Sequence, residues 1–351
     1  MSPDPADIAR HEDIEAALAA LRNPCDLNAI LFCAVPHTDP SEGPGPRTGL
    51  LHPRFREDRP MVDELARVLS EQCLYYALPR RKRLELEKEI EADFSKVARA
   101  MKIVKDVFVD FDARHPSRAS EVAEVLAYCI AQTHLSAPQV AAKMALKTSA
   151  NMPVHGLDGI HAAFEGDALT IYFLEAKLAA DAAKGARRYA KSAAEFLSDQ
   201  KQYHREYQLV GDLGHLDSLV GEARQAAIDY FDIWNKPQLP RRERYVGVIC
   251  HSEPTHFADV LPITDGPVEV HEIHFTKMYA ADRARHRATA HKAILNRKGV
   301  SEKVILFFVA VPDINRLREA FYDALGLAAP PALTEEEDDV EDETVLMGAA
   351  S

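Results

Sequence analysis

Two strand-like segments joined by a tight turn limit the possible folds of this chain more than any other feature. Residues 158–164 and 168–177 are rich in aliphatic and aromatic side chains of the kind that favours β-strands. Between them, Gly166 and Asp167 suit a two-residue hairpin turn, because glycine accepts the positive φ that such turns require. We therefore predict an antiparallel hairpin in which the residues that flank this dipeptide pair with each other.

The register of this hairpin places two acidic residues opposite each other. Continuing the pairing from the turn puts Asp158 directly across from Glu175, and directly opposed residues share a face with their β-carbons about 5 Å apart. Lys177 joins the same face, because side chains alternate along a strand. The rest of that face is apolar: Ile160, Ala162, Phe164, Leu169, Ile171 and Phe173. A slip of one residue would send one carboxylate to the opposite face.

Two carboxylates and one ammonium group at the end of an apolar face suggest phosphodiester chemistry. Carboxylates this close repel each other unless a positive charge lies between them, and oxygen ligands suit Mg²⁺ or Mn²⁺, whereas zinc favours His or Cys. Lys177 could then hold or deprotonate a water molecule, or neutralise charge that develops on a phosphate. The alternative is a catalytically idle network of ion pairs formed by Asp158, Glu175 and Lys177 on the surface.

The wider pattern predicts an α/β protein with a helical N-terminal region. We expect helices over residues 61–78, 79–101, 117–134, 180–197, 216–234 and 280–296, and strands over 141–148, 158–164, 168–177, 245–251, 268–275 and 304–311. The apolar run 104–111 fits either a strand or a buried turn. These elements suggest a helical region over residues 1–115, with an irregular Pro- and Gly-rich segment at 36–60, then a domain over 116–327 and a disordered acidic tail over 328–351.

Charge and composition exclude little about possible partners. The net charge is −13, but eight of the acidic residues lie between Glu335 and Glu343, so the total says little about any one face. The five cysteines are far apart and form no CxxC pair, which predicts reduced thiols and not a disulfide framework. No apolar run is long enough to span a bilayer and the N-terminus lacks the layout of a secretory signal, so we expect a cytoplasmic protein with no membrane partner.

The order of elements resembles the core of the PD-(D/E)xK nuclease superfamily. A helix, a strand, a strand carrying aspartate, a strand carrying Glu-x-Lys, a basic helix and a further strand follow one another, with Gly156-Leu157-Asp158 and Glu175-Ala176-Lys177 as the motifs. The resemblance implies a mixed sheet flanked by helices, Asp158 and Glu175 as metal ligands, and Lys177 as the catalytic lysine. The sequence departs from the pattern because no proline directly precedes the aspartate.

Members of that superfamily often add a glutamate from the first core helix. Glu121 and Glu124 both compete for this role here. At about 100° per residue, Glu121 flanks the apolar stripe of the predicted helix and Glu124 lies nearly opposite the stripe, so the helical geometry favours Glu121 slightly. Either glutamate could instead be solvated.

Basic residues on both sides of the acidic motif are candidates for contacts with DNA phosphates. Lys143 and Lys147 precede the strand that carries Asp158 and could contact phosphates or lie on a solvent-facing strand edge. The predicted helix after Lys177 carries a basic stripe at spacings of three and four residues, formed by Lys184, Arg187, Arg188 and Lys191.

Residues 120–177 resemble a narrower family as well, the HamA nuclease subunits of the Hachiman anti-phage defence systems. The similarity lies in SEVAEVLAYCIAQTHLSAPQVAAKMALKTSANMPVHGLDGIH and the following EAK strand. It implies a Mg²⁺- or Mn²⁺-dependent deoxyribonuclease effector controlled by a partner helicase that is encoded nearby. The alternative is a catalytically inactive subunit that keeps the fold and docks a helicase, another ATPase or DNA. No phosphate-binding Walker motif occurs in the sequence.

Overall fold

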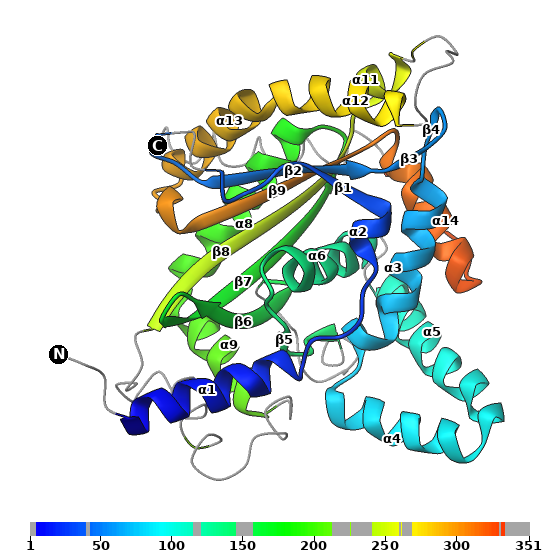
Figure 1. Ribbon diagram of the computed structural model, residues 1–351, viewed down its shortest axis with the longest axis vertical. Helices are drawn as coiled ribbons and strands as arrows, with labels where there is room; N and C mark the ends of the chain where they lie inside the picture. The colour runs from blue at the N-terminus through cyan, green and yellow to red at the C-terminus, as the bar shows by residue number, and fades with distance from the viewer. Residues whose placement is uncertain are drawn as a thin grey trace.

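A seven-stranded mixed sheet runs through the centre of the computed structural model (Figure 1). The structure describes residues 5–39, 43–114, 121–144, 157–212, 225, 241–259, 261, 269–329 and 331–333. The strands lie in the order β1-β2-β9-β8-β7-β6-β5. Their bounds are β1 Leu31–Val35, β2 Arg47–Pro53, β5 Gln139–Ala141, β6 Gly159–Glu165, β7 Ala168–Ala179, β8 Arg241–Ser252 and β9 Val304–Val311. This arrangement confirms the predicted mixed sheet flanked by helices.

Helices cover both faces of the sheet, and two separate apolar cores result. One face carries α3 (Val62–Ala77), α5 (Val97–Arg114), α6 (Glu121–His134) and α14 (Ile314–Leu325). The other carries α1 (Pro5–Ala19), α8 (Ala182–Ser198), α9 (Gln200–Asp212), α12 (Val270–Ala281) and α13 (Arg283–Asn296). Figure 1 shows α6 crossing β7 and β8. The smaller elements are α2 Leu27–Ile30, β3 Phe55–Arg56, β4 Arg59–Pro60, α4 Arg80–Ala92, η1 Phe94–Lys96, α11 Pro254–Ala258 and η4 Ser301–Lys303.

The predicted hairpin and its register are confirmed. β6 and β7 pair antiparallel from Glu165 with Ala168 to Gly159 with Leu174, and Gly166 in the turn has a φ of 68°. The apolar side chains predicted to share one face, among them Ile160 and Phe173, lie in the core beneath α8 and α9. The turn chemistry therefore fixed the pairing as expected.

The predicted strand at 268–275 is wrong, because α12 begins at Val270 and continues to Ala281. β8 and β9 pair directly and run parallel, so the segment that joins them must cross one face of the sheet, where a helix packs well. Phe275 and Tyr279 are four residues apart on α12 and both point into the core. This crossover geometry outweighed the local strand composition.

Three other expectations change in detail. The segment 36–60 is not irregular throughout, since β2 lies between Pro46 and Pro53 and is buried between β1 and β9. The ambiguous run 104–111 belongs to helix α5. Of the predicted strand 141–148, only Ala141 lies in β5, and residues 145–148 lie outside the described residues.

Some predictions fall outside the part of the chain that the structure describes. Of the predicted helix 216–234, only Gln225 is described. The acidic run Glu335–Glu343 is not described either. The boundary between residues 115 and 116 stays a prediction, although β1 and β2 from the N-terminal region belong to the same sheet as the rest. Within the described ranges, every helix is too short or too polar to span a membrane.

Candidate metal-binding site

Asp158 lies at the point where β7 extends beyond its partner strand. The last pair between β6 and β7 joins Gly159 to Leu174, while β7 continues to Ala179 alongside β8. The Asp158 amide donates to the carbonyl oxygen of Leu174 at 2.7 Å, and its carboxylate Oδ2 accepts the amide of Ala176 at 2.8 Å. These two bonds hold the aspartate against the backbone on either side of Glu175.

Glu175 and Lys177 form a close ion pair on the part of β7 that, among the described residues, extends past β6; we call this part the open edge of β7. The Lys177 ammonium lies 2.6 Å from Glu175 Oε1, and the two side chains are 16% and 8% exposed. Burial and the nearby charge of Asp158 raise the pKa of Glu175, against the opposing influence of Lys177. A desolvated carboxylate beside a second carboxylate is a group that a cation would stabilise.

Glu121 and Glu124 lie on α6 and both are buried, at 0% and 4% exposed. The alternative that either glutamate is solvated is wrong, because α3, α14 and the sheet enclose α6. Glu124 accepts a short hydrogen bond from the hydroxyl of Tyr76. Glu121 accepts one from the hydroxyl of Tyr322 at 2.9 Å. Two tyrosines from distant helices thus hold the two glutamates.

Tyr76 connects the α6 glutamates with Asp158. Burial raises the pKa of its hydroxyl well above the ordinary value, and the charges of Glu124, Asp158 and Glu121 raise it further. The hydroxyl therefore stays protonated and donates. The charges of Glu124, Asp158 and Glu121 act on this one hydroxyl, and the charge of Asp158 also acts on Glu175. Asp158 is therefore the electrostatic link within this acidic cluster, between the α6 glutamates and the strand end. The choice between Glu121 and Glu124 as a partner of the site remains a prediction.

The donor set of the cluster fits a hard divalent cation. Asp158 and Glu175 offer only carboxylate oxygens, which are the ligands that Mg²⁺ and Mn²⁺ favour. The charge of Asp158 acts on Glu175, and two carboxylates this near repel each other unless a proton or a cation balances their charge. The residues present therefore suit the metal that the sequence predicted, with Lys177 beside them.

The basic stripe of α8 lies next to this edge of the sheet. Arg188 donates from Nη1 to the carbonyl oxygen of Leu178 at 3.0 Å, directly after Lys177. Arg187 is exposed, whereas Lys184, Arg188 and Lys191 are half-buried. The stripe is therefore accessible in part, and its contact with DNA stays a prediction.

The proposed phosphate contact of Lys143 is wrong for this structure. Its side chain is fully buried, and its ammonium forms a 2.6 Å ion pair with Glu206 of α9, which is buried as completely. The same ammonium donates to the carbonyl oxygen of Leu157. An ammonium enclosed in this way cannot reach a phosphate without breaking the fold. Lys147 lies outside the described residues.

Sequence reasoning missed Tyr76 and Tyr322, the two residues that hold the α6 glutamates. Tyr76 lies 48 positions before Glu124, and Tyr322 lies 201 positions after Glu121. No motif marks either tyrosine, since a buried tyrosine in an amphipathic helix is common. Only the packing of α3 and α14 against α6 brings these hydroxyls to the carboxylates.

Comparison with known proteins places the chain in a family. No curated protein and no solved structure matches it. The family model named HamA matches residues 30–325, a span that includes every residue of the acidic cluster, the basic stripe and both tyrosines. Members of this family are components of the Hachiman anti-phage defence systems. The match covers most of the chain, and the protein therefore belongs to the HamA family.

Proposed function

We propose that this protein is a metal-dependent deoxyribonuclease, the effector of a Hachiman defence complex, with the active site at the open edge of β7. The Glu175–Lys177 ion pair beside Asp158 carries the proposal, because it combines a raised carboxylate pKa with a second carboxylate and a mostly buried ammonium. This grouping is suited to binding Mg²⁺ and a phosphate at one place. The mixed sheet flanked by helices is observed in the structure. Membership of the PD-(D/E)xK superfamily is part of the proposal.

In this proposal, Asp158 and Glu175 hold Mg²⁺ or Mn²⁺. A bound ion would polarise a phosphoryl oxygen and lower the pKa of a water molecule. The backbone amide of Ala176 donates to Oδ2 of Asp158, and this hydrogen bond fixes the orientation of the carboxylate. A proton and the ion would compete for the Glu175 carboxylate, so metal binding should weaken as pH falls.

Lys177 would act on the substrate from the same face. Its ammonium now pairs with Glu175, and metal binding would compete for that carboxylate and free the ammonium to contact the attacking water or the phosphate. Lys184, Arg187, Arg188 and Lys191 of α8 would bind the DNA backbone by charge. Control by a helicase encoded nearby belongs to this proposal as well, because a free nuclease with such a site would threaten the host DNA.

Cleavage of plasmid DNA by purified protein tests the proposal. Wild type and the variant Glu175→Ala/Lys177→Ala are compared with Mg²⁺ and with EDTA, alone and with the neighbouring gene's product. We expect Mg²⁺-dependent cleavage by the wild type and none by the variant. A matched control is Lys82→Ala/Glu85→Ala, which removes the same two residue types from an exposed ion pair on α4 and should leave cleavage unchanged.

Two outcomes would overturn the assignment in different ways. Cleavage that survives the double substitution would place the active site elsewhere. An absence of cleavage in every condition, with correctly folded protein and the partner present, would favour the alternative of an inactive subunit that docks a helicase, another ATPase or DNA.

A further inference from the structure

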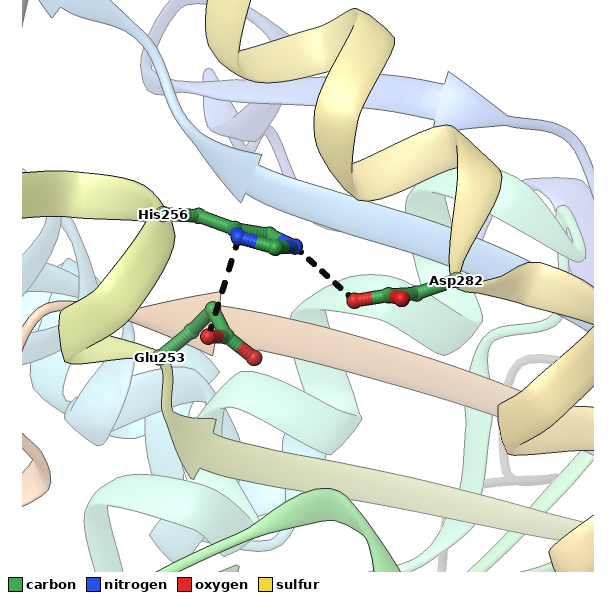
Figure 2. Close-up of side chains that lie close together, drawn as sticks. All are labelled: Glu253, His256 and Asp282. Carbon is green, nitrogen blue, oxygen red and sulfur yellow. Dashed lines mark hydrogen bonds and ion pairs between the residues drawn. The ribbon is translucent and has the colours of Figure 1, made fainter. Parts of the chain in front are cut away.

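A second group of potential metal ligands lies on the connection between β8 and β9, apart from the acidic cluster at β7. Glu253 follows β8, His256 belongs to α11, and Asp282 lies between α12 and α13. Each offers one ligand atom, and these atoms all lie within 4.8 Å of one another. Figure 2 shows the His256 imidazole between the two carboxylates. We refer to these three residues as the crossover cluster.

The crossover cluster is largely shielded from solvent. Nε2 of His256 lies 2.9 Å from Oδ2 of Asp282, with side chains 22% and 18% exposed. Nδ1 of His256 lies 4.0 Å from Oε1 of Glu253, which is 15% exposed. Glu253, His256 and Asp282 are anchored by a strand end and two helices, so their backbones are held in fixed positions.

Glu253 is the residue that most needs a cation. Within the described residues, its carboxylate accepts no hydrogen bond, and the His256 imidazole lies 4.0 Å away. A shielded carboxylate with so few protein partners is a group that a cation would stabilise. Its charge also raises the pKa of Tyr279, after the larger effect of burial, which shows that it lies over the core.

Asp282 already has positive partners. Nη2 of Arg285 lies 2.8 Å from its Oδ2. Burial acts to raise the pKa of Asp282, but the hydrogen bonds from Arg285 and His256 outweigh this effect and lower it. The charged form of Asp282 is thereby favoured, and Arg285 would compete with a metal for the same oxygen.

We propose that the crossover cluster binds one divalent transition-metal ion, with Zn²⁺ as the best fit. One imidazole nitrogen with two carboxylate oxygens suits a borderline ion such as Zn²⁺, which binds both atom types at about 2.0–2.2 Å. Ligand atoms around such an ion lie about 3–3.6 Å apart, and one atom of each residue already lies within 4.8 Å of the other two. The two carboxylates now face different ring nitrogens of His256, so the imidazole would turn to offer one nitrogen to an ion that both carboxylates bind. The donor set contrasts with the oxygen-only cluster at β7. The ion would join α11 to the junction of α12 and α13.

Zn²⁺ binding to full-length protein tests this proposal independently of DNA cleavage. All variants carry Glu175→Gln, which weakens metal binding at β7, and the retained zinc is measured by mass spectrometry after dialysis. Isothermal titration with Zn²⁺ gives the affinity. We expect one equivalent in the Glu175→Gln parent. Adding His256→Ala should weaken binding by about 100-fold or more, since loss of even an outer-sphere partner costs roughly 10- to 100-fold.

Further variants separate a metal site from an ion network and guard against misfolding. Glu253→Gln and Asp282→Asn preserve side-chain shape and should each weaken Zn²⁺ binding, and Zn²⁺ should raise the melting temperature of the parent more than that of either variant. Arg285→Gln removes the competitor of the metal, and we expect Zn²⁺ binding of equal or greater strength. Equal zinc content in the parent and the His256→Ala protein, or no zinc in either, would overturn the proposal.

Discussion

Two lysine–glutamate pairs have the same length and different environments. The Lys143 ammonium lies 2.6 Å from Glu206, and both side chains are fully buried. The Lys177 ammonium also lies 2.6 Å from Glu175, but these side chains are 16% and 8% exposed. The first pair is surrounded by further partners, because Lys143 also donates to the Leu157 carbonyl and Gln202 donates to Glu206. The second pair lies beside Asp158, which competes with it electrostatically.

The contrast shows how one ion pair can support the fold while another remains available for chemistry. Lys143 is enclosed by its partners and cannot leave them without a large desolvation cost. Glu175 is held in a state that its neighbours destabilise, as its raised pKa shows. A bound cation could relieve that repulsion. Each prediction below tests this difference by altering one of the two pairs or the groups around them.

The largest expected effect is on stability, at Lys143. Lys143→Met leaves Glu206 buried and without its ion-pair partner, which should lower the free energy of unfolding by about 3–5 kcal/mol. Urea denaturation followed by circular dichroism measures the change. The double variant Lys143→Met/Glu206→Leu should recover most of the loss, because apolar side chains need no partner. If Lys143→Met lowers the free energy of unfolding by no more than the loss of an exposed ion pair does, the Lys143–Glu206 and Lys177–Glu175 pairs do not differ in the way proposed.

The next effect is on activity, at Lys177. In the proposed nuclease, Lys177→Met should lower the rate of Mg²⁺-dependent DNA cleavage by roughly 100- to 1000-fold. The substitution removes the ammonium group that would stabilise the negative charge developing on the phosphate. Its effect on unfolding should be smaller than that of Lys143→Met, since Glu175 can take up a proton when its partner is lost. Single-turnover cleavage and urea denaturation are measured on the same preparations. Loss of stability equal to that of Lys143→Met would make Lys177 a structural residue.

A moderate effect is expected from the tyrosines that hold the α6 glutamates. Tyr76→Phe removes the donor to Glu124 and should cost about 1–3 kcal/mol of stability. It should also raise the Mg²⁺ concentration for half-maximal cleavage by roughly 10-fold, as loss of an outer-sphere partner does. Tyr322→Phe is the matched change at Glu121, and we expect it to shift the Mg²⁺ requirement less, because the charge of Asp158 acts on the Tyr76 hydroxyl. A larger shift for Tyr322→Phe would assign the site to Glu121.

The smallest effect is a pH dependence that arises from Glu175. Its pKa is raised in the folded protein by burial and by Asp158, so the folded state binds the proton more tightly than the unfolded state does. The stabilisation from this proton is complete below the unfolded pKa and is lost as pH rises through the folded pKa. In metal-free buffer, the wild type should therefore lose stability relative to Glu175→Gln as pH increases from about 4.5. Melting temperatures of the wild type and Glu175→Gln, measured as pH rises, check the direction of this change. A difference in melting temperature that does not vary with pH would contradict it.

The local sequence pattern predicted the hairpin, because the residues that pair in it are close together in the chain. Gly166 and Asp167 fixed the turn, and the alternating apolar residues fixed which face is buried. The helix that carries Glu121 and Glu124 could also be predicted, but not that both glutamates are buried. Periodicity compares residues within one helix, and the burial of α6 on all sides depends on α3, α14 and the sheet.

The predicted strand at 268–275 failed for the same reason. Its composition favours a strand, but the segment belongs to the crossover between the parallel strands β8 and β9 and packs on the sheet as helix α12. The resulting helices α12 and α13 bring Asp282 to His256, and no sequence spacing predicts that contact. Lys143 was likewise predicted to contact phosphates, but its ammonium is buried against Glu206 of α9.

The sequence by itself determined the local geometry of the candidate site: the hairpin, its register, and the placement of Asp158 next to Glu175 and Lys177. Turn preference and side-chain alternation act over a few residues, so they can be derived from the chain alone. Only the tertiary structure decided which charges are enclosed, which tyrosines hold the α6 glutamates, and where Glu253, His256 and Asp282 meet. Burial and long-range electrostatics depend on which distant segments pack together, and the packing of the whole chain sets them.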